Sequence, residues 1–347
     1  MYIKKILLTI VLLGLIGGGV LAYTVYDAFF TPNTKFNNDK AYVFIPTNSN
    51  INDVKELLEP LLIDFSSFLS AADRKKYSTN IKAGKYALKK GMNNNEIIGV
   101  LRSGNLPVKV AFNNQETVKD LAGRISKQIE ADSVSLLKAF NDSEFLEKNG
   151  FNKEDMLSMY VPNSYEFFWN VSAEGFRNKM LKEYGRFWND ERLAKAKKIG
   201  FSPKEVITLA SVVHKETAKV DERPRVAGVY LNRLRKGILL QADPTVIYAI
   251  KKESGDFTKV IKRVLYKDLE LDSPYNTYKY AGLPPGPIAM PDITAIDAVL
   301  NSEKHDYIYF VANVENFGYH KFAKTLAQHN RNKVQYVRWI NEKKINR

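Results

Sequence analysis

Residues 209–237 read LASVVHKETAKVDERPRVAGVYLNRLRKG. The stretch begins as an apolar helix, turns polar at His-Lys-Glu-Thr, crosses a charged patch and resumes as a second helix. Leu209, Val212 and Val213 form the apolar stripe of the first helix, and Glu216 follows the two valines at i+4 and i+3. Residues at those spacings share one helix face. The pattern therefore predicts a helix pair whose first member carries a carboxylate on or beside its buried face.

Two interpretations of Glu216 remain open on these residues alone. A carboxylate that extends an apolar stripe conflicts with burial, and such conflicts cluster at functional sites. A desolvated Glu keeps its proton near neutral pH and can deliver it to the leaving oxygen of a glycosidic bond. In the other interpretation Glu216 lies on a helix surface and forms a salt bridge with Lys219 or Arg223.

The composition of the chain excludes several classes of protein. The 347 residues, 45% hydrophobic and 12% aromatic, suit two domains with real cores. The absence of cysteine excludes disulfides, thiol nucleophiles and Cys-ligated metals. A formal net charge of +14 suits a nucleic acid, an anionic lipid or an acidic polymer. Because the basic residues are interleaved with acids and form no nucleic-acid-binding motif, we expect no nucleic-acid partner.

The sequence also predicts neither a serine hydrolase nor a metal enzyme. It has no Gly-x-Ser-x-Gly elbow and no His-Glu-x-x-His motif. His320 and His329 are too far apart for a helical i, i+4 ligand pair, and no glycine-rich segment is typical of a phosphate cradle. We therefore expect no metal and no cofactor, and the carboxylates remain as the candidate catalytic groups.

The N-terminal segment predicts a membrane anchor. Residues 6–26 contain no charge, and an apolar helix of about 20 residues spans the hydrocarbon core of a bilayer. Lys4 and Lys5 precede it, so the positive-inside rule predicts a single-pass protein of the cytoplasmic membrane with a cytoplasmic N-terminus and its body outside. The alternative is a signal peptide cleaved after Ala22. The apolar run is longer than is usual for a signal peptide, so we expect an uncleaved anchor over residues 1–26.

Beyond the anchor, the chain is expected to form a linker and two domains. Residues 27–40 are polar and contain Pro and Asn, which predicts the linker. Residues 41–108 predict a compact strand–helix–helix–strand unit, an order that small sugar-binding modules of the LysM type also have. Residues 109–347 predict a larger, mixed α/β domain. The expected fold class is therefore α+β with an N-terminal transmembrane helix.

Four blocks of the C-terminal half carry a family resemblance. They are ASVVHKET…ERPRVAGVYLNRLRKGILLQADPTVIYAI, SPYNTYKYAGLPPGPIAMP, YIYFVAN and HKFAKTLAQHN. In order and spacing, across residues 205–332, they resemble the endolytic murein transglycosylase family (MltG/YceG-like). The N-terminal anchor and the LysM-like unit also match the layout of that family, so the resemblance extends over nearly the whole chain.

The resemblance implies an activity and a catalytic acid. The family's catalytic Glu lies in the Lys-Glu-Thr motif and carries over onto Glu216. The implied enzyme is a peptidoglycan lytic transglycosylase whose catalytic domain is residues 109–347. It cleaves MurNAc–GlcNAc β-1,4 bonds within glycan strands, leaves 1,6-anhydroMurNAc ends, and terminates or trims nascent strands. One Glu suffices as acid and then as base, because no water is consumed.

The chain departs from the family pattern at three positions. Members often have another acid two residues before the catalytic Glu, where this chain has His214. A cationic His there would lower the pKa of Glu216. The Asp or Glu that usually follows Pro in the upstream aromatic block is Asn163, and Gln328 precedes His329 where Glu is common. We assign no catalytic role to Asn163 or Gln328.

Polar and aromatic residues in the same blocks suit sugar recognition, because saccharide sites combine fixed hydrogen-bonding groups with aromatic faces. The predicted substrate-binding residues are Asn232, Gln241, Asp243, Thr245, Asn276, Thr277, Tyr278, His320 and His329. For Asp243 an equal alternative is a purely structural role as the N-cap of the helix that begins TVIYAI.

The expected partners are peptidoglycan glycan strands, the cytoplasmic membrane and, from the resemblance, the peptidoglycan synthases of wall elongation. A second hypothesis is a non-catalytic peptidoglycan-binding scaffold, which the His214 departure favours. A third is a hydrolytic muramidase, which needs a second acid to activate water, and the sequence names none.

Overall fold

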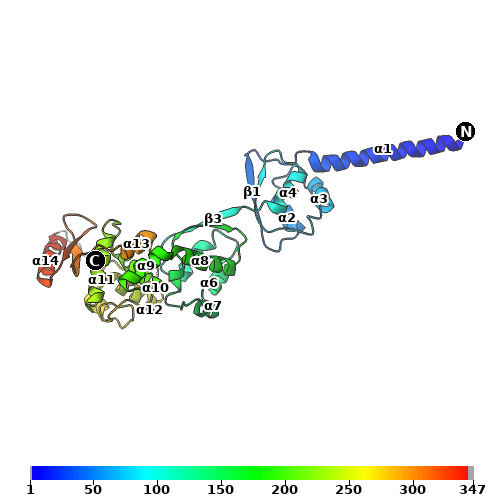
Figure 1. Cartoon of the computed structure of the whole chain (residues 1–347). Helices are drawn as coiled ribbons and strands as arrows, with labels where there is room; N and C mark the ends of the chain where they lie inside the picture. The colour runs from blue at the N-terminus through cyan, green and yellow to red at the C-terminus, as the bar shows by residue number, and fades with distance from the viewer. Residues whose placement is uncertain (1, 343–347) are drawn as a thin grey trace. The chain divides into compact units, whose positions relative to one another are not determined.

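The computed structural model describes residues 2–342, with side chains to residue 339, and has the mixed α+β composition expected from the sequence (Figure 1). Its contacts divide the chain into two compact units. The first comprises Met1–Val110, Ser126–Ala131 and Tyr165–Ser172. The second comprises Ala111–Ile125, Asp132–Ser164 and Ala173–Arg347. Two later segments thus belong to the first unit, and the boundary expected at residue 108 stays a prediction.

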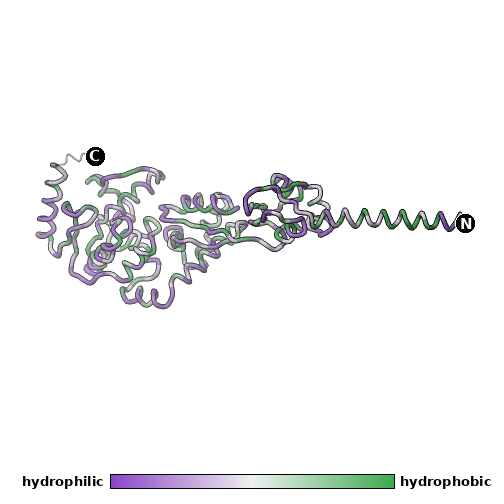
Figure 2. Tube along the Cα trace, turned by 90° about the horizontal axis from the view of Figure 1, so that it is seen from above, coloured by the Kyte–Doolittle hydropathy of each residue, from purple (hydrophilic) through white to green (hydrophobic). Residues whose placement is uncertain are grey.

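The N-terminal helix α1 (Tyr2–Phe30) has the length and composition of a membrane span. An 18-residue window of this 29-residue helix has a mean hydropathy of 2.4, and no residue of the helix is buried in protein. Figure 2 shows hydrophobic residues along most of the helix. At 1.5 Å per residue the helix is about 43 Å long, enough to cross a bilayer. This confirms an N-terminal helix of the predicted kind, and its orientation remains a prediction.

Part of the predicted linker packs on the first unit. α1 continues to Phe30, and Asn33 is buried, where it donates to the backbone oxygen of Asp64 and to the side chain of Asn94. Asn94 in turn donates to the Ala28 carbonyl. The polar composition of residues 27–40 thus reflects buried amide contacts as well as exposed chain.

The first unit has the predicted strand–helix–helix–strand order. Strands β1 (Lys40–Ile45) and β2 (Gly84–Lys89) pair antiparallel, with Lys40 opposite Lys89 and Ile45 opposite Gly84. Helices α2 (Ile51–Leu58), α3 (Phe65–Arg74) and α4 (Asn94–Ser103) cover the apolar side chains of these two strands. Capping boxes at Asn50 and Asn93 fix the starts of α2 and α4. The likeness to LysM modules remains a prediction.

The second unit is mostly helical. Strands β3 (Pro107–Phe112) and β4 (Asn163–Phe168) form a two-stranded sheet, and each has residues in both units. The unit also contains α5 (Val118–Ile125), α6 (Ser133–Phe140), α7 (Ser143–Lys148), η1 (Met156–Met159), α8 (Ala173–Phe187), α9 (Asp190–Ile199), α10 (Pro203–Glu216), α11 (Arg223–Arg235), α12 (Asp243–Ser254), η2 (Tyr266–Glu270), α13 (Ile293–Leu300), β5 (Tyr309–Ala312), β6 (His320–Ala323) and α14 (Leu326–Glu342).

Helix α10 is the centre of this unit. Its residues from Val206 to Val213 are all buried, and it packs against α11, α12 and α13 (Figure 1). Ser202 forms a capping box with Glu205, and Pro203 occupies the first turn, which fixes the start of the helix. It ends at Glu216, because Thr217 is extended. The carboxylate of interest therefore lies at the end of a helix whose central residues are buried.

The loop between η2 and α13 approaches another backbone closely at Gly286. A Cβ built there would lie 2.0 Å from the Glu154 carbonyl oxygen, so only glycine fits without moving the main chain. We expect Gly286→Ala to lower the free energy of unfolding by about 2–4 kcal/mol, because two backbones must separate. Thermal unfolding of the purified chain measures this.

The matched control is Gly123→Ala in α5, where a Cβ meets no atom within 4 Å. Because Ala is the better helix former, this control should leave stability unchanged or raise it by about 0.5–1 kcal/mol. Equal melting temperatures for the two variants would contradict the close approach at Gly286.

Candidate active site

The carboxylate of Glu216 faces the neighbouring helix. The buried Tyr230, on α11, donates its hydroxyl to Oε2 of Glu216 at 2.9 Å. The two cations considered as surface partners have other contacts: Arg223 binds Asp292, and the Lys219 ammonium lies over the Tyr319 ring. Glu216 is thus a partly buried group with a tyrosine partner, and the surface salt-bridge interpretation is wrong.

Burial raises the pKa of Glu216 from 4.5 to about 7. The His320 imidazole and the Tyr230 hydroxyl oppose this rise, because both stabilise the carboxylate. The negative charges of Asp243 and Glu222 add to it. At neutral pH the group therefore exists in both protonation states, which suits an acid that later acts as a base.

This raised pKa makes a prediction for stability. The folded chain holds the Glu216 proton more tightly than the unfolded chain, so the protonated form stabilises the fold at low pH and this contribution is lost as pH rises from about 4.5 to about 7. The isosteric Glu216→Gln does not ionise, so the variant should not lose this stability as the pH rises. We expect the variant to be up to about 3 kcal/mol more stable than the unaltered chain at pH 8 and no more stable near pH 4.

Thermal unfolding of both proteins across this pH range measures the difference. Glu253, exposed on the same unit, provides the control Glu253→Gln, whose stability should follow that of the unaltered chain at every pH. If Glu216→Gln raises the stability by the same amount at every pH, the pKa of Glu216 is not raised.

A second carboxylate, Glu222, holds His320 in place. Glu222 is buried just before α11 and accepts from the His320 backbone N–H at 2.7 Å and from its Nδ1 at 2.8 Å. Thr217, next to Glu216, also donates to Glu222 at 3.3 Å. The imidazole packs edge-on to Phe310, which itself contacts Tyr230. His320, at the start of β6, is thereby fixed beside the end of α10.

His214 belongs to a separate ion-pair cluster. Its Nδ1 lies 3.3 Å from Oδ2 of Asp292, the N-cap of α13. Arg223 is buried and donates to both Asp292 oxygens at 2.7 and 2.9 Å, and to the Thr217 carbonyl at 3.3 Å. Burial acts to raise the pKa of Asp292, but these hydrogen bonds hold it far below its usual range. The imidazole that lowers the pKa of Glu216 is therefore that of His320.

Asp243 is the first residue of α12, and its carboxylate accepts from the Tyr278 hydroxyl at 2.6 Å. The N-cap of this helix is Ala242, and no side-chain capping bond forms within the described part of the chain. The capping alternative for Asp243 is thus wrong. Asp243 is exposed, and its charge acts on Glu216, so the two carboxylates and Tyr278 belong to one site.

Gln241 is exposed and has a left-handed backbone, with φ of 50°. Its side-chain oxygen accepts from the buried Arg233 at 2.6 Å, and its N–H donates to the Thr277 carbonyl. Arg233 also donates to the carbonyls of Leu239 and Ile308. These contacts hold a non-glycine residue in an uncommon conformation, as is frequent at functional sites.

Three predicted substrate-binding residues are buried. The hydroxyls of Thr245 and Thr277 lie 2.8 Å apart, and that of Thr277 accepts from the Ala242 N–H. Asn276 donates to the carbonyls of Leu269 and Leu271. Because internal groups satisfy these side chains, direct contact with a sugar does not fit them. They hold the loops on either side of Asp243 instead.

The last two predicted residues, Asn232 and His329, contact groups other than Glu216. Asn232, on α11, donates to the His305 and Tyr307 carbonyls at 2.7 and 3.0 Å, which is a structural role. His329 stacks on Tyr309, with ring centroids 5.1 Å apart. Burial lowers the pKa of His329, and its Nδ1 has no hydrogen-bond partner among residues 2–339.

Comparison with known proteins shows the family to which the chain belongs. The family model of the YceG-like family matches residues 43–335, which is most of the chain. The chain belongs to the YceG-like family. An endolytic murein transglycosylase from Bacillus subtilis is 32% identical over 95% of this chain and 93% of its own length. One from Streptococcus pneumoniae D39 is 28% identical over 86% of this chain and 59% of its own length.

A solved structure supports the fold of this YceG-like chain. The crystal structure of a yceG-like protein from Listeria monocytogenes superposes with a TM-score of 0.57 at 32% identity. It covers 85% of this chain and 99% of the Listeria chain. The family suspected from the sequence blocks is confirmed.

Sequence reasoning missed two residues that contact the site of this YceG-like chain. Tyr230 follows Glu216 by fourteen residues, and Glu222 meets His320 across ninety-eight. The one available signal was a Glu at a helix start, Glu222, close to the Lys-Glu-Thr motif. Neither pairing has a local spacing rule, because both depend on how α10, α11 and β6 pack.

Proposed function

We propose that this YceG-like chain is a membrane-anchored endolytic peptidoglycan lytic transglycosylase. The observation that carries the proposal is Glu216: a single partly buried acid with a pKa of about 7, held by a tyrosine hydroxyl at the end of a buried helix. The printed names of the relatives from Bacillus and Streptococcus support the same reaction class.

The proposed chemistry has two proton transfers through Glu216. The protonated carboxyl gives its proton to the β-1,4 glycosidic oxygen, and the bond from this oxygen to C1 of MurNAc breaks. The carboxylate then takes the proton from the 6-hydroxyl of the same MurNAc, whose oxygen bonds to C1. The products are a free GlcNAc 4-hydroxyl and a 1,6-anhydroMurNAc end. Glu216 recovers its proton, and no water enters.

The neighbours of Glu216 suit both of its protonation states. The Tyr230 hydroxyl donates to Oε2, which leaves Oε1 for the substrate and stabilises the carboxylate after the first transfer. His320, which Glu222 holds in place, also stabilises the Glu216 carboxylate electrostatically. The oxocarbenium-like charge that develops on the sugar then faces a carboxylate whose position is fixed.

The residues around Glu216 are proposed to divide into two roles. Gln241, Asp243, Tyr278 and His320 contact the glycan, because the first two are exposed and all four adjoin the loops or strands next to Glu216. The buried Thr245, Asn276 and Thr277 position these loops, and Asn232 holds the segment that follows α13. His329 remains a predicted sugar contact.

The remaining details also belong to this proposal. Helix α1 anchors the protein as a single pass, with Lys4 and Lys5 on the cytoplasmic side and both units outside. Residues 41–108 form a LysM-like module, and peptidoglycan synthases are the expected partners. The scaffold hypothesis loses its main support, because His214 binds Asp292. A hydrolytic muramidase is the second candidate, since Asp243 is an exposed carboxylate that acts on Glu216.

Digestion of long, purified glycan strands by the full-length chain tests the proposal. Endolytic cleavage predicts a rapid fall in mean strand length and anhydro ends on every new fragment. Stepwise release of disaccharides from strand ends would contradict the endolytic part. New reducing ends without the anhydro bond would favour the muramidase.

A further inference from the structure

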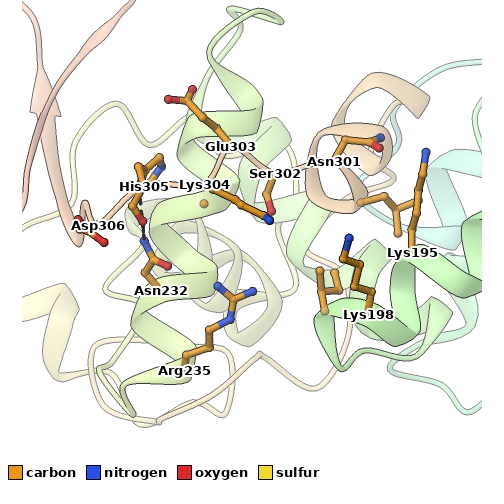
Figure 3. A pocket seen from close by; sticks show the side chains of 13 residues that line it. Lys195, Lys198, Asn232, Arg235, Asn301, Ser302, Glu303, Lys304, His305 and Asp306 are labelled. Atoms are coloured by element: carbon orange, nitrogen blue, oxygen red, sulfur yellow. Dashed lines mark hydrogen bonds between the residues drawn. The ribbon is translucent and has the colours of Figure 1, made fainter.

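A cavity of about 660 Å³ lies in the second unit, between α9, α11 and the segment that follows α13 (Figure 3). Gly228, Asn232 and Arg235 line it from one face of α11. Tyr230, the partner of Glu216, lies two residues from Asn232, about 200° around the helix axis. The cavity is therefore on the other side of α11 from the Tyr230–Glu216 contact.

The cavity is lined by four basic side chains. Lys195, Lys198, Arg235 and Lys304 contribute side chains to its lining. Lys195 pairs with Glu191 at 2.8 Å. Within residues 2–339, no carboxylate forms an ion pair with Lys198, Arg235 or Lys304. Figure 3 shows the nitrogen atoms of these three side chains turned toward the same space.

The two acids of the lining do not balance these charges. Glu303 pairs with Arg225 at 3.0 Å, and Asp306 pairs with Lys324 at 3.0 Å. Both of these partners lie outside the lining. In Figure 3 the Glu303 carboxylate points away from the lysines. Among residues 2–339, Lys198, Arg235 and Lys304 are thus left without a carboxylate partner.

The wall that carries Lys304 is fixed to α11. A Cβ on Gly228 would lie 2.6 Å from the Glu303 carbonyl oxygen and 2.6 Å from Nε2 of His305, so the loop can approach only a glycine. His305 Nε2 lies 2.9 Å from the Arg225 carbonyl, and Asn232 donates to the His305 carbonyl. The backbone at Lys304 is therefore held against α11.

We propose that this cavity is a phosphate-binding site, separate from Glu216, which takes a diphosphate or a phosphodiester head group. Three like charges around one space repel one another, and a single carboxylate would balance only one of them. A phosphate group offers several oxygen acceptors to the lysine ammonium groups and matches the fork of an arginine. Asn301 and Ser302 in the same lining add neutral hydrogen-bonding groups.

Calorimetric titration of the full-length chain in detergent tests this site, with inorganic pyrophosphate as the probe. The double variant Lys198→Ala/Arg235→Ala removes two lining cations. Its control, Lys197→Ala/Lys236→Ala, removes the same charge from adjacent exposed residues outside the lining. We expect the first to bind pyrophosphate at least about tenfold more weakly and the control to bind within about twofold of the unaltered chain.

A second titration uses glycerophosphoglycerol, the soluble head group of an anionic phospholipid. Tighter binding of this diester than of pyrophosphate assigns the site to a lipid head group, and the reverse assigns it to a diphosphate. Either order supports the site if the lining variant alone loses binding. Lys304→Ala repeats the test from the loop side. The proposal is overturned if neither probe binds, or if lining and control variants weaken binding equally, since only overall charge then matters.

Discussion

The Glu216→Gln variant is expected to form anhydro-ended products at least about a thousandfold more slowly than the unaltered chain. The amide keeps the shape of the side chain and can still accept from the Tyr230 hydroxyl. It cannot give a proton to the glycosidic oxygen or take one from the 6-hydroxyl. Both proton transfers pass through this one group, so no other residue can replace it in either step. Quantification of anhydromuropeptides by mass spectrometry measures the rate.

The control for this variant is Glu253→Gln, which removes one carboxylate from an exposed position of α12. It should retain full activity. Binding of glycan strands by Glu216→Gln should also persist, which separates loss of chemistry from loss of the fold. Activity of Glu216→Gln within about tenfold of normal would exclude Glu216 as the acid.

The second large effect is expected for Glu222→Gln, which should slow the reaction by about 10- to 100-fold. Glu222 accepts from both the backbone N–H and Nδ1 of His320, and hydrogen bonds to a charged group contribute about 1.5–3 kcal/mol each. The neutral amide weakens the hydrogen bonds that fix the imidazole, and it removes a negative charge that acts on Glu216. Glu222 is thus a positioning residue that acts through His320.

A double-mutant cycle separates this role from a loss of stability. If Glu222 acts through His320, the double variant Glu222→Gln/His320→Gln should be no slower than His320→Gln alone. The pH dependence of the rate should shift as well, because both groups act on the pKa of Glu216. Multiplicative effects of the two substitutions, with an unchanged pH profile, would reduce Glu222 to a structural residue.

Local sequence rules were sufficient for the elements that carry the site. Helical spacing placed Glu216 beside the apolar stripe of Val212 and Val213, and the structure has it at the end of the buried α10. An uncharged run predicted α1, and the local pattern of residues 41–108 predicted the strands of the first unit. Helical and strand patterns repeat every two to four residues, and over that range the sequence determines which side chains share a face.

The partners of Glu216 could not be predicted in the same way. The bond from Tyr230 depends on how α10 packs against α11, and the contacts of Glu222 depend on where the β5–β6 hairpin returns. These contacts join elements that no short spacing relates. The salt bridge between Glu216 and Arg223 that the sequence suggested does not form, because Arg223 binds Asp292 instead.

Polar residues in irregular loops gave the least reliable predictions. Thr245, Asn276 and Thr277 were expected to contact sugar, but they are buried and bind internal groups. A loop without regular structure must satisfy its backbone groups from side chains, and it uses the same Asn and Thr residues that a saccharide site uses. Composition alone does not separate the two roles, since only burial distinguishes them.

The most direct test of the account is digestion of purified glycan strands by the full-length chain in heavy-oxygen water. The account states that the MurNAc 6-hydroxyl, deprotonated by Glu216, closes on C1 and that water takes no part. New MurNAc ends should therefore contain no heavy oxygen and be one water lighter than hydrolysis products. Heavy oxygen at C1 of the new ends would contradict the account and assign a hydrolytic reaction to the same acid.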